Sequence, residues 1–193
     1  MTQVKKKIIV MTVASRTGSN SVYAANIFIK TCADHFIVEH IALPQAHIER
    51  YVDTRDEATP IFHDEDDFNG IITKILDADA FVIFSPIYWY NYPSLLKQFI
   101  DRISGVQSRP AFAFRQKVHN KPWAYVVVSG GDDKRTRDAF WVLHQEVCTF
   151  VGAKLIRGPW FVALHAHELE TKQSTFVEQT IKTFVHTLTS ELK

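Results

Sequence analysis

The chain alternates between short apolar runs and longer segments in which apolar residues return every three or four positions. Such runs are typical of buried strands, and such spacing is typical of helices with one face on a core. The predicted strands cover residues 7–13, 36–41, 80–84 and 123–128. A fifth begins at residues 155–156, is interrupted by Gly158-Pro159 and resumes at residues 160–164.

The segments between and after these strands predict helices. The first spans residues 20–34, the second is opened by the acidic run 64–67, and the third follows Pro93. Gly152 is expected to end the next helix, whose predicted core face consists of Phe140, Leu143, Val147 and Val151. The closing helix is expected to bury Val177, Ile181, Phe184, Val185 and Leu188. The stretch 45–63 is predicted to be a loop.

Strands and helices alternate five times, which predicts an α/β fold with one open parallel sheet and helices on both faces. In such sheets, ligands bind beyond the carboxyl ends of the strands, where the strand order reverses. In an order of 2-1-3-4-5, the first, third and fourth strands are neighbours. Because a loop of unusual composition follows each of these three strands, we expect the loops to meet and form one site.

Composition narrows the class of protein. With 193 residues, 46% of them hydrophobic, residues 1–193 can bury a full core and are expected to form one domain. The formal net charge of +1 favours neither a nucleic-acid partner nor an anionic membrane. Cys32 and Cys148 lie in apolar helical patterns, which indicates reduced structural thiols and too few ligands for an iron–sulfur cluster.

The start of the chain carries a targeting question. Residues 5–14 faintly resemble a secretory signal, but Arg16 and the lack of a small-residue cleavage pattern favour a first core strand. No run approaches the ~18 apolar residues of a membrane span. We therefore expect a cytoplasmic protein.

The first of the three loops, residues 13–21, has the chemistry of an anion site. It leads from a strand into a helix, so backbone N–H groups and the positive end of the helix dipole are available to a phosphate. Arg16 supplies a positive charge and Gly18 a flexible backbone. Side-chain donors come from Ser15, Ser19, Asn20 and Ser21. The loop lacks both the Gly-Lys-Ser/Thr ending and the three spaced glycines of the common nucleotide loops, which favours a terminal monophosphate such as that of FMN. The alternative is a helix start capped by Ser19 or Asn20 with nothing bound.

The other two loops suit a flat ligand. Between Pro86 and Pro93, four aromatic residues (Tyr88, Trp89, Tyr90 and Tyr92) crowd into five positions. Exposed rings cost solvation unless they pack, so they are expected to contact a planar ligand, a partner chain or the end of the third helix. After the fourth strand, Ser129-Gly130-Gly131 allows a close backbone approach, although a plain turn would use the same residues.

These motifs together resemble the superfamily of NAD(P)H-dependent FMN reductases and flavodoxin-like NAD(P)H:quinone reductases. Residues 15–21 are similar to its phosphate loop, residues 85–102 to its ring-binding loop and following helix, and residues 129–131 to its third flavin loop. The likeness covers nearly the whole chain. It departs at Ala14-Ser15-Arg16, where many relatives have Gly-Ser-Pro-Arg, and it lacks the cysteine cluster of the iron–sulfur relatives.

The resemblance implies a flavodoxin-like three-layer sandwich with non-covalent FMN. It also implies a homodimer, with a tetramer as the alternative, and flavin near the subunit interface. By position, the phosphate is expected at Ser15, Arg16, Gly18, Ser19, Asn20 and Ser21. The ribityl chain and isoalloxazine are expected at Pro86, Ile87, Tyr88 and Trp89, closed at the far edge by Ser129, Gly130 and Gly131.

The activity implied is that of an NAD(P)H-dependent flavin oxidoreductase. In a ping-pong cycle, NAD(P)H would pass a hydride to the flavin N5 and leave, and a quinone, nitro compound, azo compound or free flavin would then take the electrons in the same slot. Tyr88 is the candidate catalytic residue, steering the substrate or donating a proton, and no metal is required. Two alternatives stay open: a flavodoxin-type electron carrier, usually more acidic than this chain, and a non-catalytic flavin-binding module.

Four further groups of charged residues have weaker functional interpretations. The basic, aromatic stretch 104–120 with its flanking cations could suggest a nucleic-acid patch, but it is expected to be a solvated loop. Its best functional alternative is contact with an NADPH phosphate or a dimer partner. Segments 63–67 and 165–168 hold metal-ligand residue types, but acidic residues also favour helix starts. The group Lys134, Arg135 and Arg137 is expected on a solvated helix face, with attraction of a nucleotide phosphate as the alternative.

Overall fold

The computed structural model describes residues 4–54, 56–59 and 61–193, and its centre is one five-stranded parallel sheet. The strands are β1 (Lys7–Thr12), β2 (Ile37–Ala42), β3 (Ala80–Pro86), β4 (Pro122–Ser129) and β5 (Lys154–Val162). The α-helices are α1 (Asn20–Cys32), α2 (Phe68–Asp77), α3 (Ser94–Gln107), α4 (Phe114–Val118), α5 (Lys134–Val151) and α6 (Glu168–Glu191). The strand order is β2-β1-β3-β4-β5, so the predicted topology is confirmed.

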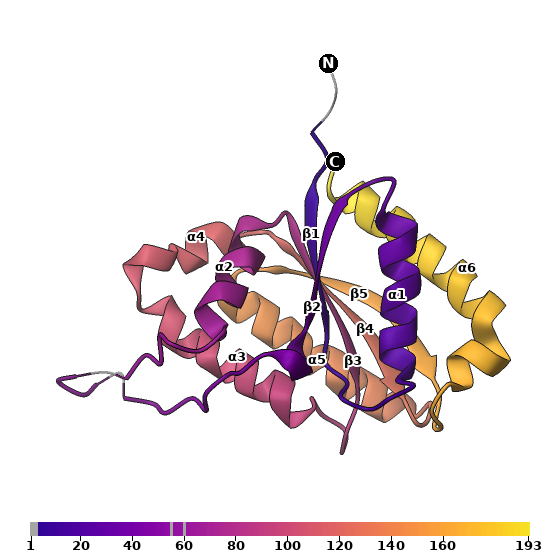
Figure 1. The fold of residues 1–193 in the computed structure, drawn as a ribbon, viewed down its shortest axis with the longest axis horizontal. Coiled ribbons are helices and arrows are strands. Elements are labelled where there is room, and N and C mark those ends of the chain that lie inside the picture. The colour runs from indigo at the N-terminus through magenta and orange to yellow at the C-terminus, as the bar shows by residue number, and fades with distance from the viewer. Residues whose placement is uncertain (1–3, 55, 60) are drawn as a thin grey trace.

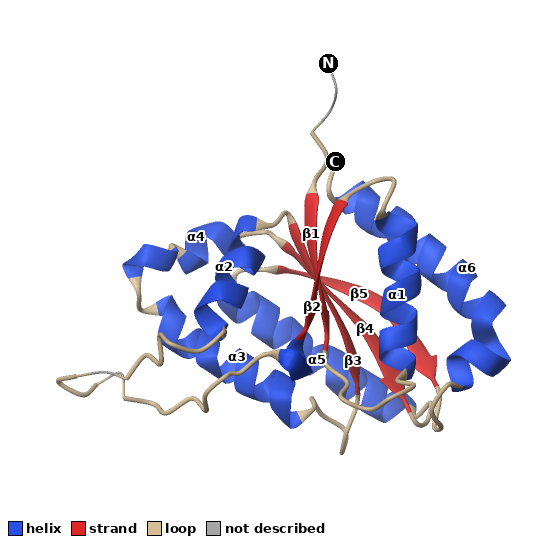
Figure 2. Ribbon diagram, in the orientation of Figure 1, coloured by secondary structure: helices blue, strands red, loops and turns tan. Residues whose placement is uncertain are grey.

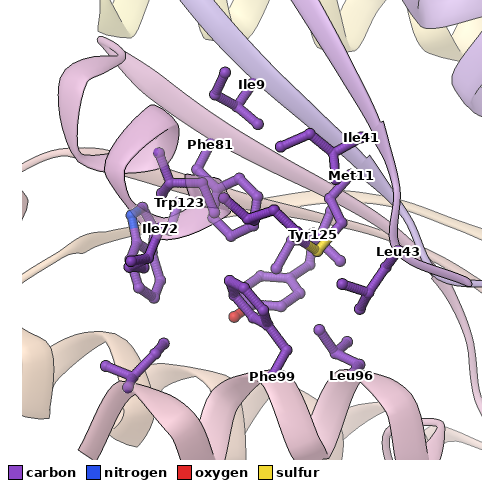
Figure 3. Close-up of a cluster of buried hydrophobic side chains, with 14 of the residues drawn as sticks. Ile9, Met11, Ile41, Leu43, Ile72, Phe81, Leu96, Phe99, Trp123 and Tyr125 are labelled. Carbon is purple, nitrogen blue, oxygen red and sulfur yellow. The ribbon is translucent and has the colours of Figure 1, made fainter. Parts of the chain in front are cut away.

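Helices cover both faces of the sheet. Figures 1 and 2 show α1 and α6 on one side and α2, α3, α4 and α5 on the other. Successive strand residues therefore alternate between two buried clusters: Val82 and Val126 pack toward α1 and α6, and Ile83 and Val127 pack toward the other layer. Figure 3 shows part of this second cluster between the sheet and its helices. The arrangement is a flavodoxin-like three-layer sandwich.

The acidic run at residues 64–67 leads directly into α2 as predicted, and its last residue, Asp67, is the N-cap of that helix. The carboxylate of Asp66 accepts hydrogen bonds from the N–H groups of Phe68 and Glu49, at 3.0 and 2.8 Å. It also pairs with the guanidinium of Arg102, which is only 4% exposed. Asp67 accepts from the N–H of His47 at 2.7 Å. These carboxylates hold the loop before α2 in place, and the helix begins at Phe68.

The core face of α5 differs from the prediction. Phe140 and Val151 are buried as expected, but Leu143 is 38% exposed and Val147 is only partly buried. The helix instead buries Phe140, Trp141, His144, Cys148 and Val151. The prediction was wrong because a histidine occupies the central core position, and a search for apolar spacing passes over it. The apolar face of α6 was predicted correctly.

Strand β5 runs through Gly158-Pro159 without a break. Its pairing with β4 shifts between Tyr125 and Val127, which marks a bulge. A Cβ atom on Gly158 would lie 2.5 Å from the carbonyl oxygen of Tyr125, so only glycine fits at this close approach. The predicted interruption is therefore a bulge inside one strand.

Residues 104–120 are more ordered than predicted. They contain the end of α3, a 3-10 turn at Pro110–Phe112 and α4, whose Phe114 and Val118 are buried. Lys121 is also buried, and its Nζ donates to the carbonyls of Ile75 and Leu76 at the end of α2. The flanking cations are paired within the described structure and do not form a basic patch: Arg109 with Asp64, Lys117 with Asp77 and Arg102 with Asp66.

Candidate functional site

The carboxyl ends of the central strands border a cleft. A cavity of about 200 Å³ lies there, lined by Arg16, Ser19, Asn20, Ser21, Pro86, Ile87, Tyr88, Val128, Gly130, Ala163 and Leu164. A second cavity of about 360 Å³ shares two of these residues and is lined by Ile87, Trp89, Tyr90, Ser129, Gly130, Gly131, Asp133 and Thr136. The three loops singled out in the sequence therefore meet at one place. Ser15 is exposed and lines neither cavity, and Gly18 lies on a neighbouring groove.

The first loop forms a donor-rich wall where α1 begins. Ser19 is the N-cap of α1, with its Oγ 3.5 Å from the N–H of Val22 and 3.0 Å from the Oγ of Ser21. Ser19, Asn20 and Ser21 are all buried, whereas Arg16 is exposed. In the described part of the chain, the backbone N–H groups of residues 15–19 have no protein acceptor. These free donors lie where the positive end of the helix dipole also favours an anion.

Asn20 uses much of its side chain inside the protein. Its Nδ2 donates to the carbonyl of His165 at 2.8 Å, and its Oδ1 accepts from the N–H of Leu169 at 3.0 Å. Asn20 therefore connects the phosphate loop to the turn between β5 and α6. One Nδ2 hydrogen remains for a ligand, so the direct part that Asn20 can take in binding a phosphate is smaller than its position in the sequence suggests.

The second loop is a tight hairpin. Tyr88 and Asn91 exchange backbone hydrogen bonds of 3.1 and 3.0 Å, with Trp89 and Tyr90 between them. Both central residues have positive φ, 49° for Trp89 and 64° for Tyr90, as in the two-residue turns that normally contain Asn and Gly. The side chain of Trp89 is 93% exposed and that of Tyr90 is 73% exposed. Bulky residues in this conformation are strained, so the turn holds two rings outside the core at an energetic cost.

The third loop supplies backbone rather than side chains. The N–H of Gly131 donates to the Oγ of Ser129 at 3.3 Å, and the carbonyl of Ser129 accepts from the N–H of Ala163 at 2.8 Å. A Cβ atom on Gly130 would lie 3.2 Å from Cδ1 of Leu164, so a glycine here lets the Leu164 side chain pack closely against the loop in the cavity wall. Beyond the loop, Asp133 caps α5, and the N–H of Arg135 lowers the pKa of its carboxylate.

The site has a fourth wall that was not predicted from the sequence. Ala163 and Leu164 follow β5 and line the first cavity, and Tyr90, Asp133 and Thr136 line the second. The available signal was the end of β5: in an order of 2-1-3-4-5, this end lies beside the third loop. The segment after it was interpreted only as a set of metal-ligand residue types.

Charges around the site are mostly paired. Lys134 pairs with Asp138, Arg135 with Asp133 and Arg137 with Asp132. Arg16 makes no ion pair with any described residue, and it lines both the first cavity and the neighbouring groove. Arg16 is therefore the cation that is available to an anionic ligand.

Metal-ligand residue types in the two acidic segments have other partners. Asp64 binds Arg109 and Asn69, and Glu168 accepts hydrogen bonds from the N–H groups of His165 and Leu164, which lower the pKa of its carboxylate. Within the residues that the structure describes, no three His, Cys, Asp or Glu side chains gather as a metal site requires. Over the same residues, no helix has the length and apolar character needed to cross a membrane.

A doubly wound parallel sheet with a donor-rich loop after β1, an aromatic loop after β3 and a glycine-containing loop after β4 is typical of flavodoxin-like nucleotide-binding proteins. Residues 7–168 match the model of the NADPH-dependent FMN reductase family. The chain therefore belongs to this family and is an NAD(P)H-dependent flavin oxidoreductase with FMN as its cofactor.

Individual relatives agree with this assignment. The chain is 32% identical over 132 residues to YwqN of Bacillus subtilis strain 168, a protein named as an NAD(P)H-dependent FMN-containing oxidoreductase, and the match covers 68% of this chain and 70% of YwqN. The fold of this chain is similar to that of the Trp repressor binding protein from Bacillus subtilis. The TM-score is 0.65 at 23% identity, over 90% of this chain and 99% of that protein. The fold is also similar to that of an FMN-dependent NADH-azoreductase from Bacillus anthracis, solved in complex with FMN. The TM-score is 0.65 at 17% identity, over 96% of this chain and 99% of the azoreductase.

Proposed function

We propose that the two adjoining cavities hold FMN, with its phosphate at the first loop and its ring between the second and third loops. The observation that carries this proposal is the convergence of three loops of complementary chemistry on one edge of the sheet. The first loop offers free N–H donors, two buried serine hydroxyls and the unpaired Arg16. The other two offer aromatic side chains and glycine backbone to a planar group.

The residues that would hold the phosphate are Arg16, Ser19 and Ser21, together with the N–H groups of residues 15–19. Pro86, Ile87 and Tyr88 would contact the ribityl chain and the ring, and Ser129, Gly130 and Gly131 would close its far edge. When bound, FMN supplies hydride acceptance from NAD(P)H and electron transfer to a second substrate. We place both substrates beside Trp89 and Tyr90, in the part of the second cavity that FMN would leave open. Because they would share this space, NAD(P)H would leave before a quinone, nitro compound, azo compound or free flavin enters.

Tyr88 is our candidate for a catalytic hydroxyl. It lines the first cavity and is 48% exposed, so its ring is accessible from the cleft. Its backbone is held by two hydrogen bonds to Asn91, which fixes where its side chain starts. A hydroxyl in this place would steer the acceptor or donate a proton to it.

We further propose a homodimer whose interface includes the hairpin tip. Trp89 and Tyr90 are large, exposed and adjacent to the site, and burying such rings against a second copy would remove apolar surface from water. The protein would act in the cytoplasm as a single FMN-binding domain. The two free, buried cysteines, Cys32 and Cys148, support a reducing compartment.

The test is purification with FMN followed by steady-state oxidation of NADH and NADPH with a quinone acceptor. We expect a yellow protein, turnover with at least one donor, and parallel double-reciprocal lines for a ping-pong cycle. Tyr88→Phe should lower kcat roughly a hundredfold if its hydroxyl donates a proton, with FMN content unchanged. Full turnover by Tyr88→Phe would remove this role. A stable one-electron flavin state without turnover would favour an electron carrier, and failure to bind added FMN would contradict the proposal.

A further inference from the structure

The turn between β5 and α6 lies against the phosphate loop, although about 145 residues separate them along the chain. This turn contains His165, His167 and Glu168, which the metal interpretation left without a role. In the structure its backbone and the ring of His167 contact the first loop. This contact raises the question of what the turn does for the site.

Three hydrogen bonds join the turn to the loop. The N–H of His167 donates to the carbonyl of Gly18 at 2.9 Å. Asn20 donates to the carbonyl of His165 at 2.8 Å and accepts from the N–H of Leu169 at 3.0 Å. The phosphate loop is thus held from outside at the start of α1, and not only by its own cap.

The shape of the contact is as specific as its hydrogen bonds. Gly18 has a φ of +67°, and a Cβ atom built on it would lie 2.2 Å from Nε2 of the His167 ring. The ring therefore fills the space that any other residue at position 18 would need. The positive φ favours glycine at position 18, and any side chain there would also displace the His167 ring from its place.

His167 is itself held in an unusual conformation. Its φ is +59°, which costs free energy for a residue with a side chain. Its Nδ1 lies 3.1 Å from Oε2 of Glu170, and the carboxylate of Glu168 accepts from the N–H groups of Leu164 and His165 at 2.9 and 3.0 Å. The turn therefore has hydrogen bonds of its own besides those to the loop, and these surroundings hold His167 in its strained conformation.

We infer that His167, oriented by Glu170, is a positioning residue for cofactor binding: it presses on Gly18 and holds the N–H groups of residues 16–19 where they can meet a phosphate. The inference rests on the proposed FMN site. It assigns His167 an effect on the phosphate alone, because the ring of the flavin would lie at the other loops. Without the histidine, the loop would have to be ordered by the ligand, and affinity would fall.

The experiment compares FMN with riboflavin, which lacks the phosphate, as ligands of apoprotein. Quenching of flavin fluorescence gives a Kd for each. His167→Ala should raise the Kd for FMN roughly tenfold or more. The Kd for riboflavin should change less than about twofold. Glu170→Gln should produce a smaller loss in the same direction. His186→Ala, an exposed histidine on the same helix, is the matched control and should change neither Kd.

A second arm tests the contact with Gly18. Gly18→Ala should weaken FMN binding in the wild-type background and should cost less in the His167→Ala background, because the ring that the new methyl group meets is gone. Equal losses in the two backgrounds would contradict the contact.

The outcomes separate this inference from the proposed function. Wild-type protein that binds neither flavin overturns both. Wild-type protein that binds FMN, with variants that keep its affinity, overturns the inference alone. If FMN and riboflavin lose affinity equally in His167→Ala, the histidine serves the general fold and not the phosphate, which also overturns it.

Discussion

His144 is a polar side chain at the centre of an apolar layer. None of its surface is exposed. The centroid of its ring lies 3.7 Å from the ring centroid of Phe140 and 4.0 Å from that of Tyr125. Its Nδ1–H donates to the carbonyl of Phe140 at 2.7 Å, whereas Nε2 has no partner among the described residues. Burial lowers the pKa of His144 from 6.5 to about 4, so the residue is neutral in the folded protein at neutral pH.

This depressed pKa predicts acid sensitivity. Below pH 6.5 the unfolded chain binds a proton at His144 that the folded chain refuses until about pH 4. The stability that the neutral ring contributes is therefore present above pH 6.5 and lost as the pH falls toward 4. The loss in the free energy of unfolding should be about 3 kcal/mol by pH 4, measured by urea titration at each pH.

The matched variants isolate this residue from the other histidines. His144→Phe and His144→Leu should each flatten the pH dependence between 6.5 and 4, because neither side chain binds a proton. His186→Gln, a change at an exposed position, should keep the wild-type slope. A wild-type slope in both His144 variants would mean that other groups cause the acid sensitivity.

At the scale of elements, the hairpin after β3 lowers the stability of the fold while it exposes two rings for their proposed function. A left-handed conformation costs a residue with a side chain about 1–2 kcal/mol, and this turn has two such residues in succession, Trp89 and Tyr90. Both rings are largely exposed, so little core packing offsets that cost. Replacing Trp89-Tyr90 by Asn-Gly should raise the free energy of unfolding of the monomer by about 2 kcal/mol.

The same replacement should impair what the rings are proposed to do. Light scattering should show a larger monomer fraction, and the KM for the acceptor should rise because two residues lining the second cavity are gone. Val142→Ser removes an exposed apolar side chain from α5 and serves as the control, with no change expected in either measurement. A less stable protein with an unchanged dimer would contradict both parts of this argument.

Elements differ in how far their sequence predicts them. The strands and their order could be predicted because buried parallel strands are continuous apolar runs, and because the loops after β1, β3 and β4 stand out in composition. The buried face of α5 could not be predicted, since His144 in the core breaks the apolar spacing. The turn after β5 could not either, because its contacts with Gly18 and Asn20 join residues that are distant in the sequence.

At the scale of the whole molecule, the proposed site lies at an edge of the sheet where loops lead into both layers of helices. The first loop leads into α1, and the turn after β5 leads into α6, which belong to one layer. The second and third loops lead into α3 and α5, in the other layer. Figure 1 shows these helices on opposite sides of the sheet, so the sheet and the loops at its edge connect the two layers. A ligand that contacts all four loops would therefore link both halves of the fold.

This arrangement predicts that FMN stabilises the entire protein and not a local segment. A ligand that binds only the folded state, present at 100 times its Kd, stabilises it by about 2.7 kcal/mol. For a domain of this size, that should raise the Tm of apoprotein by roughly 5–10 °C in one cooperative transition, measured by scanning calorimetry. Because Arg16 is the unpaired cation at the first loop, Arg16→Gln should lower the Tm gain at the same FMN concentration while leaving the Tm of apoprotein unchanged. Riboflavin should give wild-type and Arg16→Gln proteins the same small gain, since the guanidinium has no phosphate to bind. An FMN-induced shift that Arg16→Gln retains in full would mean that the phosphate does not lie at this loop.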